Sequence, residues 1–192
     1  MDFLLAWDTR LFLAINNGQA NQFFDWLMPF VTNLKNFAVI LAVAAIALMI
    51  IKKREGIIVV CALGIALGFA DGIASNVIKK TVDRDRPCIT LENHGCRALM
   101  GRKTSPSFPS AHAANTFAAA VVLTFYYRRK WWLWFFIALV ISYSRIYVGV
   151  HYPLDVIAGA AVGVLAGKTV TLGWPLMFPV HARDKENPNH AQ

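Results

Sequence analysis

The sequence predicts an all-α membrane protein, a bundle of five transmembrane helices preceded by N-terminal helices that lie in the membrane interface. Of the 192 residues, 57% are apolar and 16% are charged, whereas soluble domains average about 45–50% apolar and about 25% charged residues. The basic residues that give the net charge of +8 stand in short clusters between long apolar runs. This pattern is typical of membrane proteins and argues against a nucleic-acid-binding face.

Five apolar runs approach the roughly 20 residues that a helix needs to cross a bilayer. The runs and the residues that bound them are 36–51 before Lys52-Lys53-Arg54, 56–78 before Lys79-Lys80, 110–127 before Arg128-Arg129-Lys130, 131–144 with Arg145 near its far end, and the run from Pro153 to about Trp174. Asp71 interrupts the second run, and because an intramembrane carboxylate is costly we expect it to face the bundle interior or the water-exposed end, in a supporting role.

Residues 1–33 are apolar but broken by polar side chains, so we expect interfacial helices there, with a sixth span as the alternative. The side chains expected at headgroup depth are those of Trp7, Phe23, Phe24 and Trp26. Residues 1–15 lack a basic n-region and carry Asp2 and Asp8, which argues against a cleavable signal peptide.

No change in composition divides the chain, so we expect one membrane domain over residues 1–180 and a polar, disordered tail over residues 181–192. Three cysteines exclude a disulfide-dense secreted scaffold. Cys88 and Cys96 lie in one loop, and whether they pair is left open.

Small residues and aromatic residues recur at positions that favour packing and anchoring. Glycines at helical spacing let helices approach closely in lipid, and we expect both stripes to pack inside the bundle rather than to form a dimer face. The stripes are Gly64, Gly68, Gly72 and Gly159, Gly163, Gly167. Aromatic residues beside a basic cluster are typical of an interfacial belt, here Tyr126, Tyr127, Trp131, Trp132 and Trp134.

The polar residues of the apolar runs collect at one end of the expected bundle. Because consecutive spans alternate in direction, the loop 79–109 and the turn 149–152 emerge on the same side of the membrane. The residues placed there are Lys79, Arg86, Ser110, His112, Arg145, His151 and Asp155. Polar residues gathered at one membrane depth indicate a functional site.

Lys79, Arg86 and Arg145 suit a ligand with two or more negative charges, because arginine forks match phosphate oxygens and lysine adds a compact charge. The remaining cations of this end are expected to snorkel to the interface. These are Lys80, Arg84, Arg97, Arg102 and Lys103.

Ser110 is a good N-cap for the third run, and a helix N-terminus offers free N–H groups to an anion. His151 and Asp155 are four residues apart, with Pro153 at an expected first helical position. If a helix begins there, the Asp155 carboxylate reaches one His151 nitrogen and leaves the other free as a nucleophile.

Together, Lys79-x6-Arg86-Pro87, Pro109-Ser110-Ala111-His112 and Ser144-Arg145-x5-His151-x3-Asp155 resemble the three-part signature of the type 2 phosphatidic acid phosphatase (PAP2) superfamily. The one departure is Ala111, where the family usually has glycine, and alanine still supplies a backbone N–H. The resemblance implies a PAP2-like helical bundle around residues 79–155.

The resemblance also implies a mechanism. His151 would attack phosphorus and form a phosphohistidine, Asp155 would orient His151, and His112 would protonate the leaving oxygen and then activate water. The phosphate oxygens would be held by Lys79, Arg86, Ser110, the Ala111 N–H and Arg145. No metal and no cofactor would be required.

A site at the membrane surface implies a lipid phosphate or diphosphate as substrate, and by analogy with the family undecaprenyl diphosphate is preferred. Phosphatidylglycerophosphate, phosphatidate and the lipid A 1-phosphate are the alternatives, and a lipid phosphotransferase would use the same residues. The alternative that is not an enzyme is a small transporter, which would need polar residues through the bilayer depth, whereas here they collect at one end. The oligomeric state is not indicated by the sequence.

Basic residues lie on both sides of the expected bundle, so the positive-inside rule only slightly favours a cytoplasmic position for the 52–54 and 128–130 clusters. With the family resemblance, this places the protein in a bacterial inner membrane as a multi-pass protein. The active site would open to the periplasm or the outside.

Overall fold

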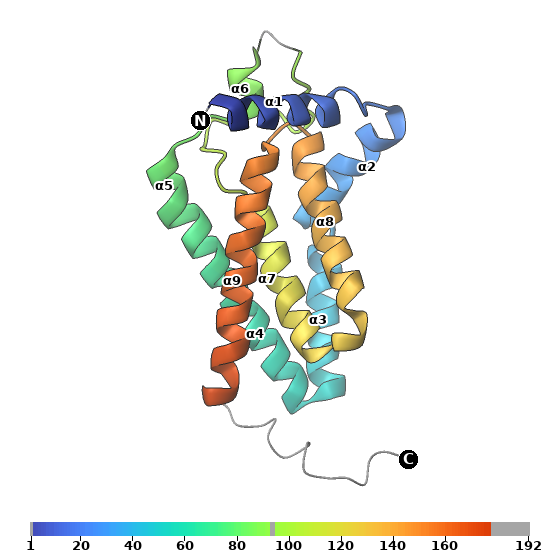
Figure 1. Ribbon diagram of the computed structural model, residues 1–192. Helices are drawn as coiled ribbons and strands as arrows, with labels where there is room; N and C mark the ends of the chain where they lie inside the picture. The colour runs from blue at the N-terminus through green and yellow to red at the C-terminus, as the bar shows by residue number, and fades with distance from the viewer. Residues whose placement is uncertain (1, 93–94, 178–192) are drawn as a thin grey trace.

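The computed structural model describes residues 2–92 and 95–177, and within these residues it is helical without strands (Figure 1). Its main helices stand side by side, and α1 crosses one end of them. The helices are α1 (Asp2–Asn16), α2 (Gln22–Thr32), α3 (Ala38–Lys52), α4 (Arg54–Asp71), α5 (Lys79–Val82), α6 (Pro87–Thr90), α7 (Ala111–Tyr126), α8 (Trp131–Tyr147) and α9 (Pro153–Met177).

Each of the five predicted runs forms a helix, with boundaries close to those expected: α3, α4, α7, α8 and α9. The second run continues past Asp71 as a π-helical segment, Gly72–Ile78, before α5. Two helical stretches are long and apolar enough to cross a membrane, Arg54–Thr90 and Pro153–Gly173, and α3 and α7 are shorter apolar helices. The helices are therefore as predicted, and the count of five spans stays a prediction.

The core of the bundle lies between α4, α7 and α9 and is built from small side chains. Ala66 and Ala70 of α4 pack against Ala114 and Ala118 of α7, and Ala166 of α9 joins the same cluster. Side chains this small allow the helix backbones to approach closely.

The glycine stripe of α9 packs inside the bundle, as predicted. A Cβ atom on Gly163 would lie 2.1 Å from the Ala114 carbonyl oxygen, and one on Gly159 would lie 2.3 Å from that of Ser110. The prediction is wrong for the stripe in α4 and the π-helical segment, because a Cβ on Gly64, Gly68 or Gly72 would meet nothing within 4 Å.

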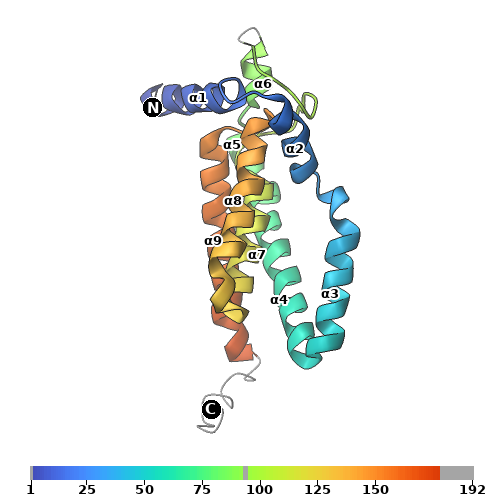
Figure 2. The ribbon, with the colours of Figure 1, turned by 90° about the vertical axis from the view of Figure 1, so that its right-hand side faces the viewer.

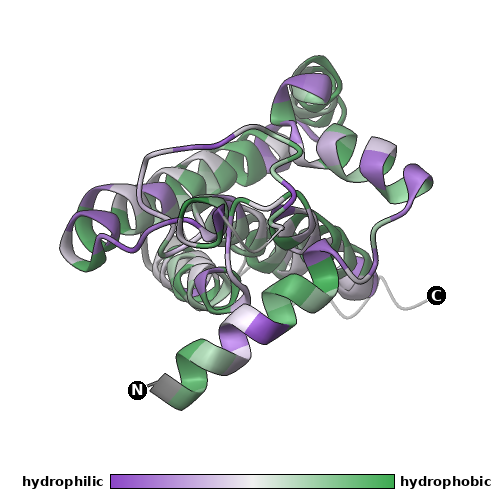
Figure 3. Ribbon diagram, turned by 90° about the horizontal axis from the view of Figure 1, so that it is seen from above, coloured by the Kyte–Doolittle hydropathy of each residue, from purple (hydrophilic) through white to green (hydrophobic). Residues whose placement is uncertain are grey.

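Helix α1 lies across the end of the bundle where α8 and α9 meet (Figures 1 and 2). Phe12 and Asn16 are buried against the bundle, whereas Phe3 and Trp7 are more than half exposed. Seen from above, α1 is mostly apolar with a polar stretch in its middle (Figure 3). This is the arrangement expected of an interfacial helix rather than of a sixth span.

The aromatic residues of the N-terminal segment divide between surface and interior. Phe23 and Trp26 of α2 are exposed, with relative accessibilities of 61% and 66%. Phe24 is half-buried against Tyr147, with ring centroids 5.8 Å apart, so it packs on α8 instead of facing the interface. The predicted polar tail, residues 181–192, lies outside the described residues.

Cys88 of α6 and Cys96 of the following loop form a disulfide bond, with their Cα atoms 5.2 Å apart. This bond settles the pairing that the sequence left open. It closes the loop against the turn between α8 and α9, where Gly149 has a φ of +84°. A Cβ at this position would lie 2.4 Å from the Arg97 carbonyl oxygen and 2.9 Å from the Cys88 Sγ, so the turn requires glycine.

Candidate active site

The structure places the predicted site residues at one end of the bundle, below α1. They come from five segments: the start of α5, the residue before α6, the start of α7, the end of α8, and the turn and first residues of α9. In chain order they are Lys79, Arg86, Ser110, Ala111, His112, Arg145, His151 and Asp155.

The turn that carries His151 is fixed by the end of α8. The backbone N–H groups of Val150 and His151 both donate to the Arg145 carbonyl oxygen, at 3.2 Å and 3.3 Å. His151 is 2% exposed. Its imidazole is therefore held in place inside the protein.

Arg86 is buried and makes its hydrogen bonds to uncharged oxygens. Its Nε donates to the Ser105 carbonyl oxygen at 2.7 Å, and its Nη1 donates to that of Val150 at 2.8 Å. Nη2 donates to the Ser105 Oγ at 3.0 Å and to the Pro106 carbonyl oxygen at 3.3 Å. The same Nη1 lies 3.5 Å from the His151 Nε2, which places this guanidinium beside the candidate nucleophilic nitrogen.

Arg145 is 3% exposed and donates from Nη1 to the Thr32 Oγ1 at 2.6 Å. Its Nε is buried without a hydrogen-bond partner among the described residues. Within the same residues, neither Arg145 nor Arg86 has a carboxylate oxygen within 4 Å. Buried cations without a counter-charge are costly, so this pair is suited to an anion from outside the chain.

Ser110 joins the starts of α7 and α9. Its side chain caps α7 by accepting from the Ala113 N–H at 3.4 Å, and its own N–H donates to the Asp155 carbonyl oxygen at 2.8 Å. Ala111 begins α7, and the first amides of a helix have no partner within it and can face an anion.

His112 and Lys79 are half-buried beside these groups. Charge–charge interactions connect His112 with Lys79, Arg145 and His151. Lys79 interacts in the same way with Arg86 and Arg145. The cations of the site thus form one cluster.

Asp155 lies next to His151, but the two are not hydrogen-bonded. The His151 Nδ1 is 3.6 Å from the Asp155 Oδ2, longer than a hydrogen bond, and Nδ1 has no other partner in the described chain. The expected contact is therefore present only as a close approach. Catalytic hydrogen bonds often shorten to full strength only when substrate is bound.

Burial lowers the pKa of His151 to about 4, although the Asp155 carboxylate partly opposes this shift. A buried imidazole is neutral at pH 7 because the charged form loses its hydration. The nitrogen opposite Asp155, Nε2, then carries a free electron pair.

The prediction that Arg84 and Arg97 snorkel to the interface is wrong. Arg84 donates to Asp8 and Asp155, at 2.7 Å each, and Arg97 is bound to Asp25 and to the Asn16 carbonyl oxygen. Hydrogen bonds with Asp25 and then with Tyr147 raise the pKa of Arg97. Both arginines bind carboxylates of the N-terminal helices, and no sequence pattern indicates these pairings.

The other three residues expected to snorkel differ among themselves. Lys80 is exposed, and Arg102 forms an exposed ion pair with Glu92. Burial, followed by the positive charges of Arg145 and Arg86, lowers the pKa of Lys103. Lys103 is exposed, but its charge interacts with those of Arg145, Arg86 and His112. It therefore lies at the exposed edge of the cation cluster, which could not be predicted from the sequence because its loop has no helical register.

Among the described residues no three His, Cys, Asp or Glu side chains are close enough together to hold a metal ion. The expectation of a metal-independent reaction stays a prediction. Asp71, for which we expected a supporting role, accepts a hydrogen bond from the Ser75 Oγ at 3.2 Å and interacts electrostatically with Lys79.

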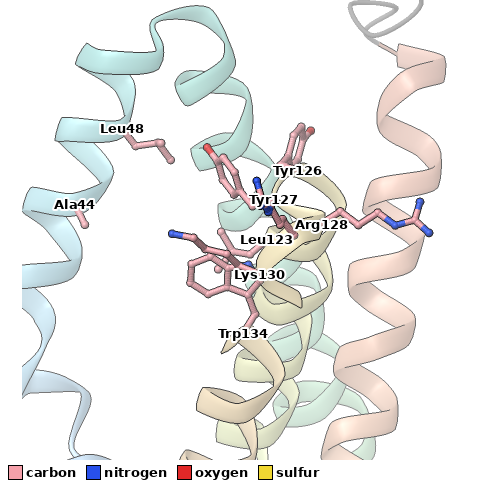
Figure 4. Close-up of a pocket in the computed structure, with 9 residues that line it drawn as sticks. Ala44, Leu48, Leu123, Tyr126, Tyr127, Arg128, Lys130 and Trp134 are labelled. Atoms are coloured by element: carbon pink, nitrogen blue, oxygen red, sulfur yellow. The ribbon is translucent and has the colours of Figure 1, made fainter. Parts of the chain in front are cut away.

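A pocket of about 550 Å³ opens at the opposite end of the bundle (Figure 4). Ala44 and Leu48 of α3 form one wall, and the turn from α7 to α8 forms the other with Tyr126, Tyr127 and Trp134. Three of the five expected belt aromatics thus line a pocket, whereas Trp131 and Trp132 are exposed. This pocket is separate from the cluster around His151.

Comparison with known proteins identifies relatives along most of the chain. The lipid A 4′-phosphatase of Bacteroides thetaiotaomicron is 31% identical over 190 residues, which cover 94% of this chain and 80% of the relative. The undecaprenyl-diphosphatase of Sulfolobus acidocaldarius is 32% identical over 165 residues, 83% of this chain and 74% of the relative.

The fold also has a solved counterpart. The crystal structure of Aquifex aeolicus LpxE superposes with a TM-score of 0.69 at 30% identity, covering 84% of this chain and 92% of that one. The model of the PAP2 superfamily matches residues 56–177, which include each part of the three-part signature. The chain therefore belongs to the PAP2 superfamily.

Proposed function

We propose that this protein is a membrane lipid phosphatase that hydrolyses a lipid phosphate or diphosphate through a phosphohistidine at His151. The observation that carries the proposal is the pair of buried arginines, Arg86 and Arg145, that have no carboxylate partner within the described residues and lie beside a buried neutral histidine. A phosphate group supplies the missing counter-charge, and arginine matches its oxygens in geometry.

In the first step the His151 Nε2 attacks phosphorus, a P–N bond forms, and the P–O bond to the lipid breaks. His112, in its protonated form, gives its proton to the departing oxygen. In the second step a water oxygen attacks phosphorus, its proton passes to His112, and the P–N bond breaks to release phosphate. Asp155 stabilises the positive charge that His151 acquires.

The oxygens of the transferred phosphoryl group would be held by the cation cluster and by the start of α7. Charge that develops on these oxygens is stabilised by donors already in place, which is the main contribution a protein makes to phosphoryl transfer. The residues assigned to this role are Lys79, Arg86, Lys103, Ser110, the Ala111 N–H and Arg145.

We further propose that α3, α4, α7, α8 and α9 cross a bacterial inner membrane, with the site on the periplasmic or outer side. The disulfide between Cys88 and Cys96 supports this orientation, because disulfides persist in oxidising compartments. The exposed apolar face of α1 would then rest in the outer leaflet, where a lipid headgroup can approach His151.

Among lipid substrates we propose undecaprenyl diphosphate, on which the relative from Sulfolobus acidocaldarius acts by its name. The relative from Bacteroides thetaiotaomicron is a lipid A phosphatase, so lipid A is the second candidate. A phosphotransferase would use the same residues and would differ only in the acceptor that attacks the phosphohistidine.

The test is phosphate release by the purified protein in EDTA from undecaprenyl diphosphate, lipid A, phosphatidylglycerophosphate and phosphatidate, with His151→Ala as the control. We expect release from at least one lipid, faster than from glycerol 3-phosphate, and none from His151→Ala. Release that requires an added divalent ion, or that persists in His151→Ala, would contradict the proposed mechanism. No release from any lipid would contradict the proposed function.

A further inference from the structure

A buried carboxylate in the interfacial helix α1 connects this helix to the active site. Asp8 has a side chain that is 0% exposed, and both of its oxygens are used. Oδ1 accepts from the Leu154 N–H in the first turn of α9 at 2.8 Å, and Oδ2 accepts from the Arg84 Nη2 at 2.7 Å. Asp8 thus binds α1 to the helix that carries Asp155.

Arg84 links Asp8 to Asp155, the carboxylate beside the candidate nucleophile His151. Its second nitrogen, Nη1, donates to the Asp155 Oδ1 at 2.7 Å, and its guanidinium lies 4.0 Å from the centre of the Tyr152 ring. Tyr152 in turn packs against Phe12 of α1, with ring centroids 5.4 Å apart. The fork of Arg84 therefore spans two carboxylates and is stacked in a fixed plane.

This arrangement decides how much negative charge faces His151. Arg84 alone would neutralise Asp155, and a neutral pair stabilises a positively charged imidazole poorly. Asp8 balances Arg84, so the three groups together keep one negative charge. The Oδ2 of Asp155 meanwhile stays aligned by the Tyr152 N–H, at 2.8 Å, on the side of the His151 Nδ1.

We propose that Asp8 is a positioning residue of the active site, which holds Arg84 so that Asp155 keeps its orientation toward His151 and its effective negative charge. The proposal rests on the proposed function, in which His151 is the nucleophile. It makes α1 part of the catalytic unit: the outer face of this helix, with Phe3, Trp7 and Leu11 exposed, contacts the membrane, and its inner face supports the catalytic carboxylate.

The first test is Asp8→Asn. The amide nitrogen introduced by this substitution would face either Arg84 or the Leu154 N–H, and one of these donors would lose its acceptor. We expect kcat to fall about tenfold, the rate effect of about 1.4 kcal/mol, with KM and the inhibition constant of inorganic phosphate unchanged within about twofold. Arg86 and Arg145, which hold the phosphate, are not altered.

The matched control is Asp83→Asn. Asp83 precedes Arg84, is exposed, and has a left-handed backbone (φ 43°) that asparagine tolerates. The Asp83→Asn variant should have an unchanged kcat. The proposal would be overturned if Asp83→Asn lowered kcat as much as Asp8→Asn does, or if Asp8→Asn changed KM alone.

The second test uses charge balance. Arg84→Gln leaves Asp8 buried without its cation, whereas the double variant Asp8→Asn/Arg84→Gln again leaves one negative charge, on Asp155. The double variant should therefore be several-fold more active than Asp8→Asn alone, because it restores the net charge of the wild-type group, and the two substitutions should be non-additive. A double variant whose loss equals the product of the two single losses would contradict the inference.

The arms of this experiment separate the two proposals. Wild-type protein and His151→Ala report on the proposed function, and the Asp8 variants report on positioning. Should the wild type release no phosphate, ¹⁵N-histidine NMR still reads the positioning without turnover. We expect a His151 imidazole protonated at Nδ1 in the wild type, a changed signal in Asp8→Asn and an unchanged one in Asp83→Asn; identical spectra in all three would contradict the inference.

Discussion

Arg86 and Arg145 differ from the neighbouring arginines of the site end in what they contact. Arg84, Arg97 and Arg102 each bind a carboxylate, whereas the two site arginines donate to carbonyl and hydroxyl oxygens. The Nε of Arg145 has no hydrogen-bond partner among the described residues, so this guanidinium retains hydrogen-bonding capacity for a ligand, and both guanidiniums retain their charge. On the proposed mechanism, that ligand is the phosphoryl group.

Arg145→Gln removes one of these charges and keeps a similar shape. Because the charge is buried beside the reacting group, we expect kcat/KM for phosphate release to fall by about 10²–10³, as for the loss of one oxyanion donor. Arg129→Gln, at an exposed position at the other end of the bundle, should retain wild-type kinetics. Equal losses in the two variants would show that net charge, not the site, controls the rate.

The acid limb of the pH profile follows from the state of His151. Its pKa is lowered by burial to about 4, and the nucleophile must be neutral. As pH falls, kcat/KM should therefore be retained through about 6.5, the ordinary value for histidine, and decline toward pH 4. The measurement is kcat/KM against pH on protein that remains folded over this range. A fall in kcat/KM that is centred at the ordinary histidine pKa of about 6.5 or above would contradict the buried environment described for His151.

For individual residues, the sequence predicts position best within the three-part signature. Every residue of the three-part signature lies in the site end, although the Asp155 contact to His151 is longer than expected. The interfacial assignment of Arg84 and Arg97 is wrong because their partners, Asp8 and Asp25, are more than 70 positions away, on helices whose contacts with the bundle have no local signal in the sequence. The spacing of the signature contains no information about such partners.

At the scale of elements, the approach of α7 to α9 positions Ser110 against the start of α9. The two backbones are close enough that a Cβ on Gly163 would lie 2.1 Å from the Ala114 carbonyl oxygen. The hydrogen bond from the Ser110 N–H to the Asp155 carbonyl oxygen depends on the same approach. The close packing of α7 on α9 therefore also sets the position of Ser110 relative to Asp155.

Gly163→Ala should therefore destabilise the protein by about 1–3 kcal/mol, the usual cost of overpacking, and should lower activity as α9 moves away from α7. The matched control is Gly68→Ala, where a Cβ meets nothing within 4 Å and alanine is the better helix former by about 1 kcal/mol. Thermal unfolding in detergent measures both. If Gly68→Ala destabilised the protein as much as Gly163→Ala, the loss of stability could not be attributed to the close approach of α7 and α9.

Hydrophobic run length is enough to predict α3, α7, α8, α9 and α4 with its π-helical continuation, and to place their ends within a few residues, because each run is closed by a basic cluster or a turn. It is not enough to distinguish the two glycine stripes. Both have the same spacing, and only the neighbouring helix decides whether the glycine face is covered. The π-helical segment before Lys79 also has no signature in the residue pattern.

At the scale of the whole molecule, polarity is arranged along the bundle axis. Helices α1 and α6 lie at one end of the bundle, and the turn from α7 to α8 lies at the other (Figure 1). The disulfide of Cys88 in α6 and the cation cluster belong to the first end, and the pocket beside Arg128, Arg129 and Lys130 belongs to the second (Figure 4). A channel or transporter needs polar groups through the membrane depth. The observed arrangement instead favours chemistry at one membrane surface.

Sidedness is tested by thiol labelling. In a Cys61→Ala background, reduction frees Cys88 and Cys96, and an impermeant thiol reagent should label them on intact cells. A cysteine placed at Gln192 should react only after lysis. Labelling of position 192 but not of the loop would reverse the proposed orientation and place the chemistry on the cytoplasmic leaflet.

The central claim is that His151 carries the phosphoryl group during turnover. The most direct measurement is rapid acid-free quenching of the enzyme with a lipid diphosphate in EDTA, followed by mass spectrometry of the peptide that contains His151. The suitable variant for this measurement is His112→Ala, because water activation then slows and a diphosphate still provides a good leaving group. The expected result is a peptide heavier by one phosphoryl group, with the phosphate on His151; turnover by the wild type with phosphate on another residue, or unimpaired turnover in His151→Ala, would contradict it.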